Sequence, residues 1–153
     1  MLSIRKANHN DIPGIRKIHR ACVKTLCKTR YTRDEIRAWL DSLTYEFYDR
    51  TYREGYFAVA HERGIVRGFG AASNDRRFIT ALYVIPPYNG RGIGARLLKR
   101  LETVIARAGV KTITVNASLN AVSFYANHGY RTERRYDLQL PDGTPLPYIR
   151  MKK

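Results

Sequence analysis

Three glycines, Gly90, Gly92 and Gly94, alternate with other residues directly before an apolar pattern of helical spacing. Glycine lets the backbone approach a ligand closely, and the first amides of a helix have no intrahelical acceptor. Such a row of amides, together with the positive end of the helix dipole, suits a phosphate group. Arg91 and Arg96 add positive charge to the same segment. The spacing therefore predicts a phosphate-binding turn at the start of a helix.

Two other classes of phosphate-binding protein share part of this pattern, and the sequence argues against both. Gly90-x-Gly92-x-x-Ala95 fits the start of a dinucleotide-binding fingerprint, which also needs an acidic residue about 20 positions later. Residues 103–132 contain no aspartate or glutamate. A phosphate loop of nucleotide hydrolases needs a terminal Gly-Lys-Ser or Gly-Lys-Thr, which is absent here. A turn that binds nothing is the remaining alternative, and its glycines would then destabilise the helix start without purpose.

The segments around this turn follow the periodicities of a mixed α and β protein. Strands are expected at Leu2–Ala7, Tyr56–Ala60, Ile65–Ala72, Phe78–Ile85, Lys111–Val115, Tyr130–Leu140 and Pro147–Met151. Helices are expected over residues 11–26, from the Thr32-x-x-Glu35 capping box to Leu40, at Arg91–Ala108 and at Asn120–Asn127. This order predicts an α/β or α+β fold around one mixed sheet. With 153 residues, the whole chain (1–153) is expected to form a single domain.

The composition is that of a globular protein, with 44% hydrophobic and 27% charged residues. No stretch approaches the roughly 20 consecutive apolar residues that cross a bilayer, so we expect no membrane partner. Met1–Lys6 lacks the apolar stretch and cleavage site of a signal peptide, and we expect a cytoplasmic protein. The net charge of +15 favours anionic partners, which include phosphorylated cofactors, nucleic acid and lipid headgroups.

The two cysteines, Cys22 and Cys27, lie five positions apart in a segment of helical pattern. They do not form a CxxC pair, so a metal site or a redox site is disfavoured. We expect buried, reduced thiols and no bound metal.

Two segments resemble motifs of the Gcn5-related N-acetyltransferase (GNAT) superfamily. Asn89–Gly94 is similar to its acyl-CoA-binding motif, Gln/Arg-x-x-Gly-x-Gly/Ala, with Asn89 in place of the usual glutamine or arginine. Asn116–Tyr130 is similar to the family's Asn-Ala-x-x-x-Ala-x-x-Phe-Tyr-x-x-x-Gly-Phe/Tyr segment. The start of the chain, Ile4-Arg5-x-Ala7 followed by Asp11, fits the family's first strand and helix. The chain is therefore identified as a small, single-domain, bacterial-type member.

The resemblance implies a mixed, mostly antiparallel sheet that is flanked by helices and splayed between its fourth and fifth strands. Acetyl-CoA, the acyl donor, would lie in this gap, and no metal would take part. The implied contacts with it are the backbone of Leu82, Tyr83 and Val84 for the pantetheine arm, Asn89, Gly90, Arg91, Gly92, Ile93, Gly94 and Ala95 for the pyrophosphate, and Asn116, Ser118 and Asn120 from the other side.

The implied activity is acetyl transfer to a primary amine by direct attack on the thioester. This reaction needs loss of a proton from the ammonium, polarisation of the carbonyl and stabilisation of the departing thiolate. A strand amide near Leu82 or Tyr83 is the expected donor to the carbonyl oxygen. Tyr125 resembles the family's general acid for the thiolate; the alternative is a core aromatic residue beside Phe124.

The general base is not identified by the sequence. Family members often carry an acidic residue on the fourth strand, and Phe78–Leu82 has none. His19, Glu35 and His61 are the candidates, and a chain of water molecules is the alternative.

Residues 33–54 differ from the rest of this basic chain, because they hold six acidic and four basic residues. The acidic residues are Asp34, Glu35, Asp41, Glu46, Asp49 and Glu54. The same stretch, slightly extended, contains the aromatic residues Tyr31, Trp39, Tyr45, Phe47, Tyr48, Tyr52, Tyr56 and Phe57. In the family this region forms the acceptor side of the cleft, where an acidic, aromatic wall would attract a cationic amine. We therefore predict a small-molecule primary amine as acceptor; a solvated helix face with core aromatics is the alternative.

Other assignments remain open at this stage. The acceptor amine can belong to an aminoacyl-tRNA or a protein, or the chain can be a non-catalytic module that binds acyl-CoA or nucleic acid. Nucleic-acid binding is disfavoured, because the longest basic clusters, Arg96–Arg100 and Arg131–Arg135, are short. A homodimer is compatible with the sequence.

Overall fold

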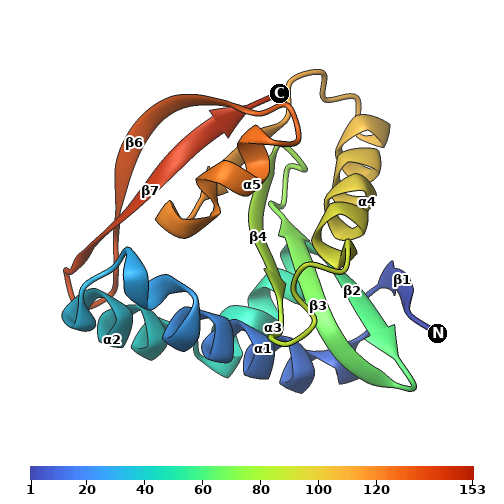
Figure 1. Cartoon of the computed structure of the whole chain (residues 1–153), viewed down its shortest axis with the longest axis horizontal. Coiled ribbons are helices and arrows are strands. Elements are labelled where there is room, and N and C mark those ends of the chain that lie inside the picture. The colour runs from blue at the N-terminus through green and yellow to red at the C-terminus, as the bar shows by residue number, and fades with distance from the viewer.

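Figure 1 shows the computed structural model of the protein, which describes residues 1–153. Seven strands form one sheet in the order β1-β2-β3-β4-β5-β7-β6, and only the β4–β5 pair is parallel. The strands are β1 (Ser3–Lys6), β2 (Tyr56–Glu62), β3 (Ile65–Ala72), β4 (Phe78–Val84), β5 (Thr114–Ala117), β6 (Arg131–Gln139) and β7 (Pro145–Lys152). The helices are α1 (Ile12–Thr25), α2 (Arg33–Ser42), α3 (Tyr45–Glu54), α4 (Ile93–Arg107) and α5 (Val122–Ala126), with 3₁₀ turns at His9–Asp11, Cys27–Thr29 and Leu119–Ala121. The predicted fold, a mixed and mostly antiparallel sheet flanked by helices, is confirmed.

The first two helices follow the polar caps that the sequence predicts. Asn8 and Asp11 form a capping box at the 3₁₀ turn that leads into α1. At the start of α2, the hydroxyl of Thr32 accepts a hydrogen bond from the amide of Glu35 at 3.1 Å. The carboxylate of Glu35 accepts one from the amide of Thr32 at 2.8 Å. These bonds satisfy amides that the 3₁₀ turn and α2 would otherwise leave unpaired, so the turn begins after Asn8 and α2 begins after Thr32.

Helix α3 is absent from the sequence prediction, which places two helices before β2 where the structure has three. The hydroxyl of Thr44 caps α3 by accepting a hydrogen bond from the amide of Phe47 at 3.2 Å. Tyr48 is the only buried residue of this helix. A helix that buries one aromatic side chain has no aliphatic stripe of helical spacing, and the prediction missed it for that reason.

The two faces of the sheet carry separate apolar clusters. Ile15 and Ile18 of α1 pack with Phe69 of β3 on the face covered by α1, α2 and α3. Leu97 and Leu101 of α4 belong to the cluster on the other face. In Figure 1 the blue and cyan helices α1 to α3 run along the lower side, and α4 and α5 lie above them. The central strands β2, β3 and β4 are therefore buried between two layers of helices.

Strands β4 and β5 separate soon after they meet. Their pairing is limited to Phe78 with Thr114 and Ile79 with Val115. The remainder of β4, residues 80–84, has no partner strand on the β5 side, while β5 itself continues in register with β7. The predicted opening between the fourth and fifth strands is confirmed.

The bounds of two predicted elements differ in the structure, and Cys27 lies outside the helix. Strand β5 begins at Thr114 rather than at Lys111, because the exposed Lys111 precedes the segment that pairs with β4. The helix expected at Asn120–Asn127 is reduced to a 3₁₀ turn followed by α5. Cys27 lies in the 3₁₀ turn after α1, and both cysteines are buried and unpaired, as expected. No helix in the chain combines the length and the apolar character needed to cross a membrane.

Candidate active site

The turn before α4 presents main-chain amides at the helix N-terminus. Gly90 and Gly92 have φ angles of +78° and +77°, a left-handed conformation that favours glycine. A Cβ atom at either position would meet nothing within 4 Å, so the backbone conformation, not lack of space, favours glycine here. Gly92 is the N-cap residue of α4, and no side chain caps this helix. Its first amides are therefore available to an anion.

The remaining residues of this turn hold it against the core. A Cβ atom on Gly94 would lie 3.3 Å from Cε1 of Phe124, so the close approach of α4 to α5 depends on a residue without a side chain. The side chain of Ile93 is buried in the cluster under α4. The guanidinium of Arg91 stacks on the ring of Tyr88 at 4.9 Å. The predicted phosphate-binding residues thus form the turn and the first residues of α4, at its uncapped N-terminus.

On the β5 side, the backbone of β4 has no strand partner at Leu82, Tyr83 and Val84. Leu82 and Val84 pack into the cluster under α4, whereas Tyr83 contacts the cluster on the opposite face. This alternation is that of an extended strand, whose backbone groups without a strand partner can pair with an amide-containing ligand.

The three polar residues predicted on the far side of the opening have different surroundings. The Oδ1 atom of Asn116 accepts a hydrogen bond from Nε of Arg150 at 3.1 Å. Asn116 and Ser118 both line a cavity, described below. The Oδ1 atom of Asn120 is buried without a hydrogen-bond donor. Buried polar atoms are nearly always paired, so this oxygen is an unused acceptor.

Tyr125 lies in α5, with its ring 5.2 Å from that of Phe124 and 5.6 Å from that of Tyr130. The residue is only 3% exposed, and its hydroxyl forms no hydrogen bond within the chain. Burial raises the pKa of Tyr125 well above its ordinary value, so the phenol stays protonated throughout the physiological pH range. This ionisation state is the one that a proton donor needs.

A cavity of about 530 Å³ lies between the β4–β5 opening, helices α1 to α3 and the β6–β7 hairpin. Its walls are mostly apolar and contain the aromatic residues Tyr31, Trp39, Phe47, Tyr48, Phe57, Phe69, Tyr83 and Tyr148. Thr80 and Ala81 of β4 line its side toward the opening. The cavity therefore has the size and character of a small-ligand site.

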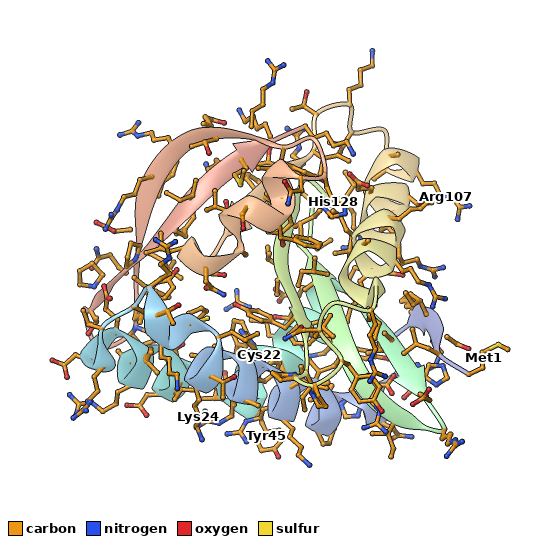
Figure 2. The ribbon with its side chains drawn as sticks, in the orientation of Figure 1. Met1, Cys22, Lys24, Tyr45, Arg107 and His128 are labelled. Carbon is orange, nitrogen blue, oxygen red and sulfur yellow. The ribbon has the colours of Figure 1, made fainter.

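Helix α1 turns its apolar face to this region. The thiol of Cys22 donates to the backbone oxygen of Val84 at 3.4 Å, which joins α1 to the end of β4. In Figure 2 the side chain of Cys22 points toward the sheet, whereas Lys24 and Tyr45 point away from it. The contact positions the buried side chains of α1 beside the opening.

Of the three candidate bases, only His19 lines the cavity. Its Nδ1 atom is 2.8 Å from the hydroxyl of Tyr48. Burial, with a smaller effect from the charge of Arg20, lowers the pKa of His19 to about 3, so the imidazole is neutral at physiological pH. Glu35 closes the capping box of α2, and His61 lies on β2 outside the cavity.

The predicted acidic wall is wrong, although its aromatic part is present. Of the six acidic residues in 33–54, only Glu54 lines the cavity, and its carboxylate pairs with Arg50 at 3.2 Å. Asp34 and Asp49 pair with arginines on their own helices. The charged faces of α2 and α3 point to solvent, since the buried Trp39 and Tyr48 occupy their inner faces. The cavity residues among the predicted aromatic set are Tyr31, Trp39, Phe47, Tyr48 and Phe57.

The β6–β7 hairpin supplies cavity residues that the sequence reasoning missed. Leu138, Leu146 and Tyr148 line the cavity, and Arg150 contacts Asn116 at its edge. The alternation of Tyr148 and Arg150 along a predicted strand was the available signal. It shows that the two residues share a face but not which strand or cavity that face meets.

Comparison with known proteins identifies the class. The chain matches the acetyltransferase (GNAT) domain family over residues 27–152. This match covers most of the chain, and the protein belongs to the GNAT family, as its motifs predicted. An uncharacterized acetyltransferase of Streptococcus pyogenes serotype M3 is 37% identical over 54 residues. That segment covers 35% of this chain and only 38% of the relative.

Solved structures share the fold over nearly the full length. A GCN5-related N-acetyltransferase from Rhodopseudomonas palustris superposes with a TM-score of 0.91 at 26% identity, covering 99% of this chain and 94% of that one. The PaiA N-acetyltransferase of Thermoplasma acidophilum, crystallised with coenzyme A, has a TM-score of 0.80 at 19% identity, covering 100% and 98%. At 19% identity, the similarity to the PaiA structure shows a shared fold only.

Proposed function

We propose that this protein, acting as one domain over residues 1–153, transfers the acetyl group of acetyl-CoA to a primary amine of a small molecule. The observation that carries the proposal is the opening between β4 and β5, which lies between an uncapped helix N-terminus and an aromatic cavity. The helix end suits a diphosphate, and the cavity suits a compact acceptor. Membership of the GNAT family supports acetyl transfer, and the PaiA N-acetyltransferase, which shares the fold, was crystallised with coenzyme A.

The residues around the opening fit a CoA thioester. The turn at Gly90 and Gly92 would hold the pyrophosphate through main-chain amides. The free edge of β4 at residues 82–84 would pair with the amides of the pantetheine arm. The buried Oδ1 of Asn120 lacks a donor, and a ligand N–H would supply one. Acetyl-CoA itself supplies an activated acyl group.

Groups of the chain would act on the carbonyl oxygen and on the sulfur of the thioester. An amide of β4 near Leu82 or Tyr83 would donate a hydrogen bond to the thioester oxygen as negative charge develops there. The phenol of Tyr125 would give its proton to the departing thiolate and would regain one from the nitrogen, which loses a proton as the amide forms.

We further propose that the acceptor amine enters the cavity as the free base. The desolvation that lowers the pKa of His19 to about 3 also disfavours an ammonium ion beside it. Glu54, the one carboxylate of the cavity, is already paired with Arg50. The ammonium proton would therefore go to solvent, and neutral His19 would accept a hydrogen bond from the bound amine.

The pH dependence of kcat/KM tests this order of events. We expect kcat/KM to rise about tenfold per pH unit up to the solution pKa of the amine used, and to shift when a less basic amine replaces it. An inflection at the same pH for amines of different basicity would assign the proton to a protein group instead.

The overall activity is tested by acetyl-CoA titration calorimetry together with thiol release over a panel of amines. Saturable binding and amine-dependent thiol release are expected. Saturable binding without release for any small amine, peptide or aminoacyl-tRNA would indicate a binding module. Absence of binding would refute the proposal.

A further inference from the structure

Two arginines of the β6–β7 hairpin lie opposite each other without a carboxylate between them. Arg134 is the cross-strand partner of Arg150, and Arg150 is the partner of Asn116 on β5, so all three lie on one face of the sheet. None of the salt bridges of the chain includes either arginine. Like charges directly opposite each other destabilise a strand pair. An anion bound between them would remove this repulsion.

Aromatic rings hold both guanidinium groups in place. The Cζ atoms of Arg134 and Arg150 lie 5.0 Å and 4.6 Å from the ring centroid of Tyr136. Arg150 also lies 5.0 Å from the ring of Phe78, and its Nε donates to Asn116 at 3.1 Å. Stacking orients the planar groups but leaves their net charge and most of their N–H donors unused.

The two carboxylates of β6 form no salt bridge with Arg134 or Arg150. Glu133 pairs with Lys152 at 2.7 Å. Asp137 alternates with Tyr136 along β6 and therefore belongs to the opposite face.

The arginine pair lies at the rim of the aromatic cavity. Asn116 and Tyr148, the two hydrogen-bond partners of Arg150, both line the cavity. Leu138, which shares a face with Arg134, lines it as well. Arg134 is exposed and Arg150 is half-buried, so an acidic group can reach them while the rest of the ligand occupies the cavity.

We propose that Arg134 and Arg150 bind an oxyanion, a carboxylate or a phosphate, carried by the acyl acceptor. Two fixed guanidinium groups offer the paired donors that such anions accept. The acceptor is then an amine with an apolar or aromatic body and an acidic group, in the manner of an amino acid, and not a polyamine. The identity of the ligand as acceptor rests on the proposed function; the anion site itself does not.

An equilibrium experiment tests the anion site without catalysis. The probes are 3-phenylpropanoate and its uncharged match 3-phenylpropanamide, measured by calorimetry. The wild-type chain should bind the carboxylate at least about tenfold more tightly than the amide. Arg134→Gln and Arg150→Gln should remove this preference, and Arg131→Gln, on the same strand outside the pair, should retain it. Equal binding of the two probes, or binding of neither, would overturn the proposal.

A kinetic experiment tests which anion binds and whether the acyl acceptor carries it. Phenylalanine, its aminophosphonate analogue and phenethylamine share one apolar body, and kcat/KM is compared among them. A higher kcat/KM for one of the two acids than for phenethylamine, lost in Arg150→Gln, would support the site. The preferred acid would show whether the site binds a carboxylate or a phosphate-like group. Equal kcat/KM for phenethylamine, or a raised KM for acetyl-CoA in Arg150→Gln, would overturn it. No transfer to any amine, with selective carboxylate binding intact, would refute only the proposed function.

Discussion

Burial stabilises the uncharged forms of two side chains near the opening, His19 and Tyr125. Burial lowers the pKa of His19 to about 3 and raises the pKa of Tyr125. Removing a charge from water is unfavourable, so each group keeps its neutral form. The inner part of the candidate site therefore offers neutral hydrogen-bonding groups, and two arginines without a salt bridge, Arg134 and Arg150, lie at its rim.

The lowered pKa of His19 predicts that the fold is sensitive to acid. The unfolded imidazole takes up a proton at about pH 6.5, whereas the folded one does so only near pH 3. Between these values the unfolded state binds more protons, so the stability is complete above about pH 6.5 and falls as pH decreases toward 3. By pH 5 the loss is about 2 kcal/mol. Urea unfolding at pH 7 and pH 5 measures it.

A variant separates this effect from other titrations. His19→Asn should lose less unfolding free energy between pH 7 and pH 5 than the wild type, whatever its absolute stability. His61→Asn, on β2 outside the cavity, should keep the wild-type difference. The same pH dependence in His19→Asn and in the wild type would contradict the prediction.

Removal of the Tyr125 hydroxyl distinguishes a catalytic acid from a core aromatic residue. Tyr125→Phe should lower kcat by about 100-fold, the typical contribution of a positioned proton donor. Its free energy of unfolding should change little, because the hydroxyl has no partner within the chain. Tyr130→Phe, which loses a 2.8 Å hydrogen bond to Glu102, should show the opposite pattern of lower stability and retained kcat. An unchanged kcat in Tyr125→Phe would show that Tyr125 is a core aromatic residue and not the general acid.

At the level of elements, the turn before α4 can be tested with two glycines of the same geometry. Gly92 and Gly109 flank α4, have φ angles of +77° and +83°, and would each have open space for a Cβ atom. Alanine at either position should reduce stability by about 1 kcal/mol through backbone strain. Only Gly92→Ala should weaken acetyl-CoA binding, by about tenfold in calorimetry, because only that turn is proposed to hold the pyrophosphate. Equal affinities in the two variants would place the phosphates elsewhere.

Elements with long apolar repeats were predictable from the sequence, and contacts between distant elements were not. Ile93, Leu97 and Leu101 mark α4 by helical spacing, and their burial follows. Charge excess in residues 33–54 did not reveal which side of α2 and α3 faces the cavity, so the acidic wall was wrong. The pairing of Arg134 with Arg150 depends on strand register across a hairpin, which local periodicity does not specify.

At the scale of the whole molecule, the opening in the sheet needs support from outside the sheet, because β4 and β5 share so few pairs. The N-terminal helices provide this support from one side. The thiol of Cys22 reaches β4, and the hydroxyl of Tyr31 bridges the two segments on the far side of the opening. The cavity is thus bounded by contacts between residues far apart in the chain.

The hydroxyl of Tyr31 joins the helical layer to strand β7 and to the segment after β5. It donates to the carbonyl of Pro147 on β7 at 2.7 Å and accepts from the amide of Leu119 at 3.0 Å. Tyr31→Phe leaves both backbone groups unpaired and should lower the free energy of unfolding by about 1–3 kcal/mol in urea titrations. It should also raise KM for the acceptor while leaving acetyl-CoA affinity unchanged, since the turn before α4 is not touched. Tyr45→Phe, whose hydroxyl is unbonded on a 59% exposed residue, is the control and should alter neither property. If Tyr31→Phe were as stable as this control, the opening would be maintained by packing alone.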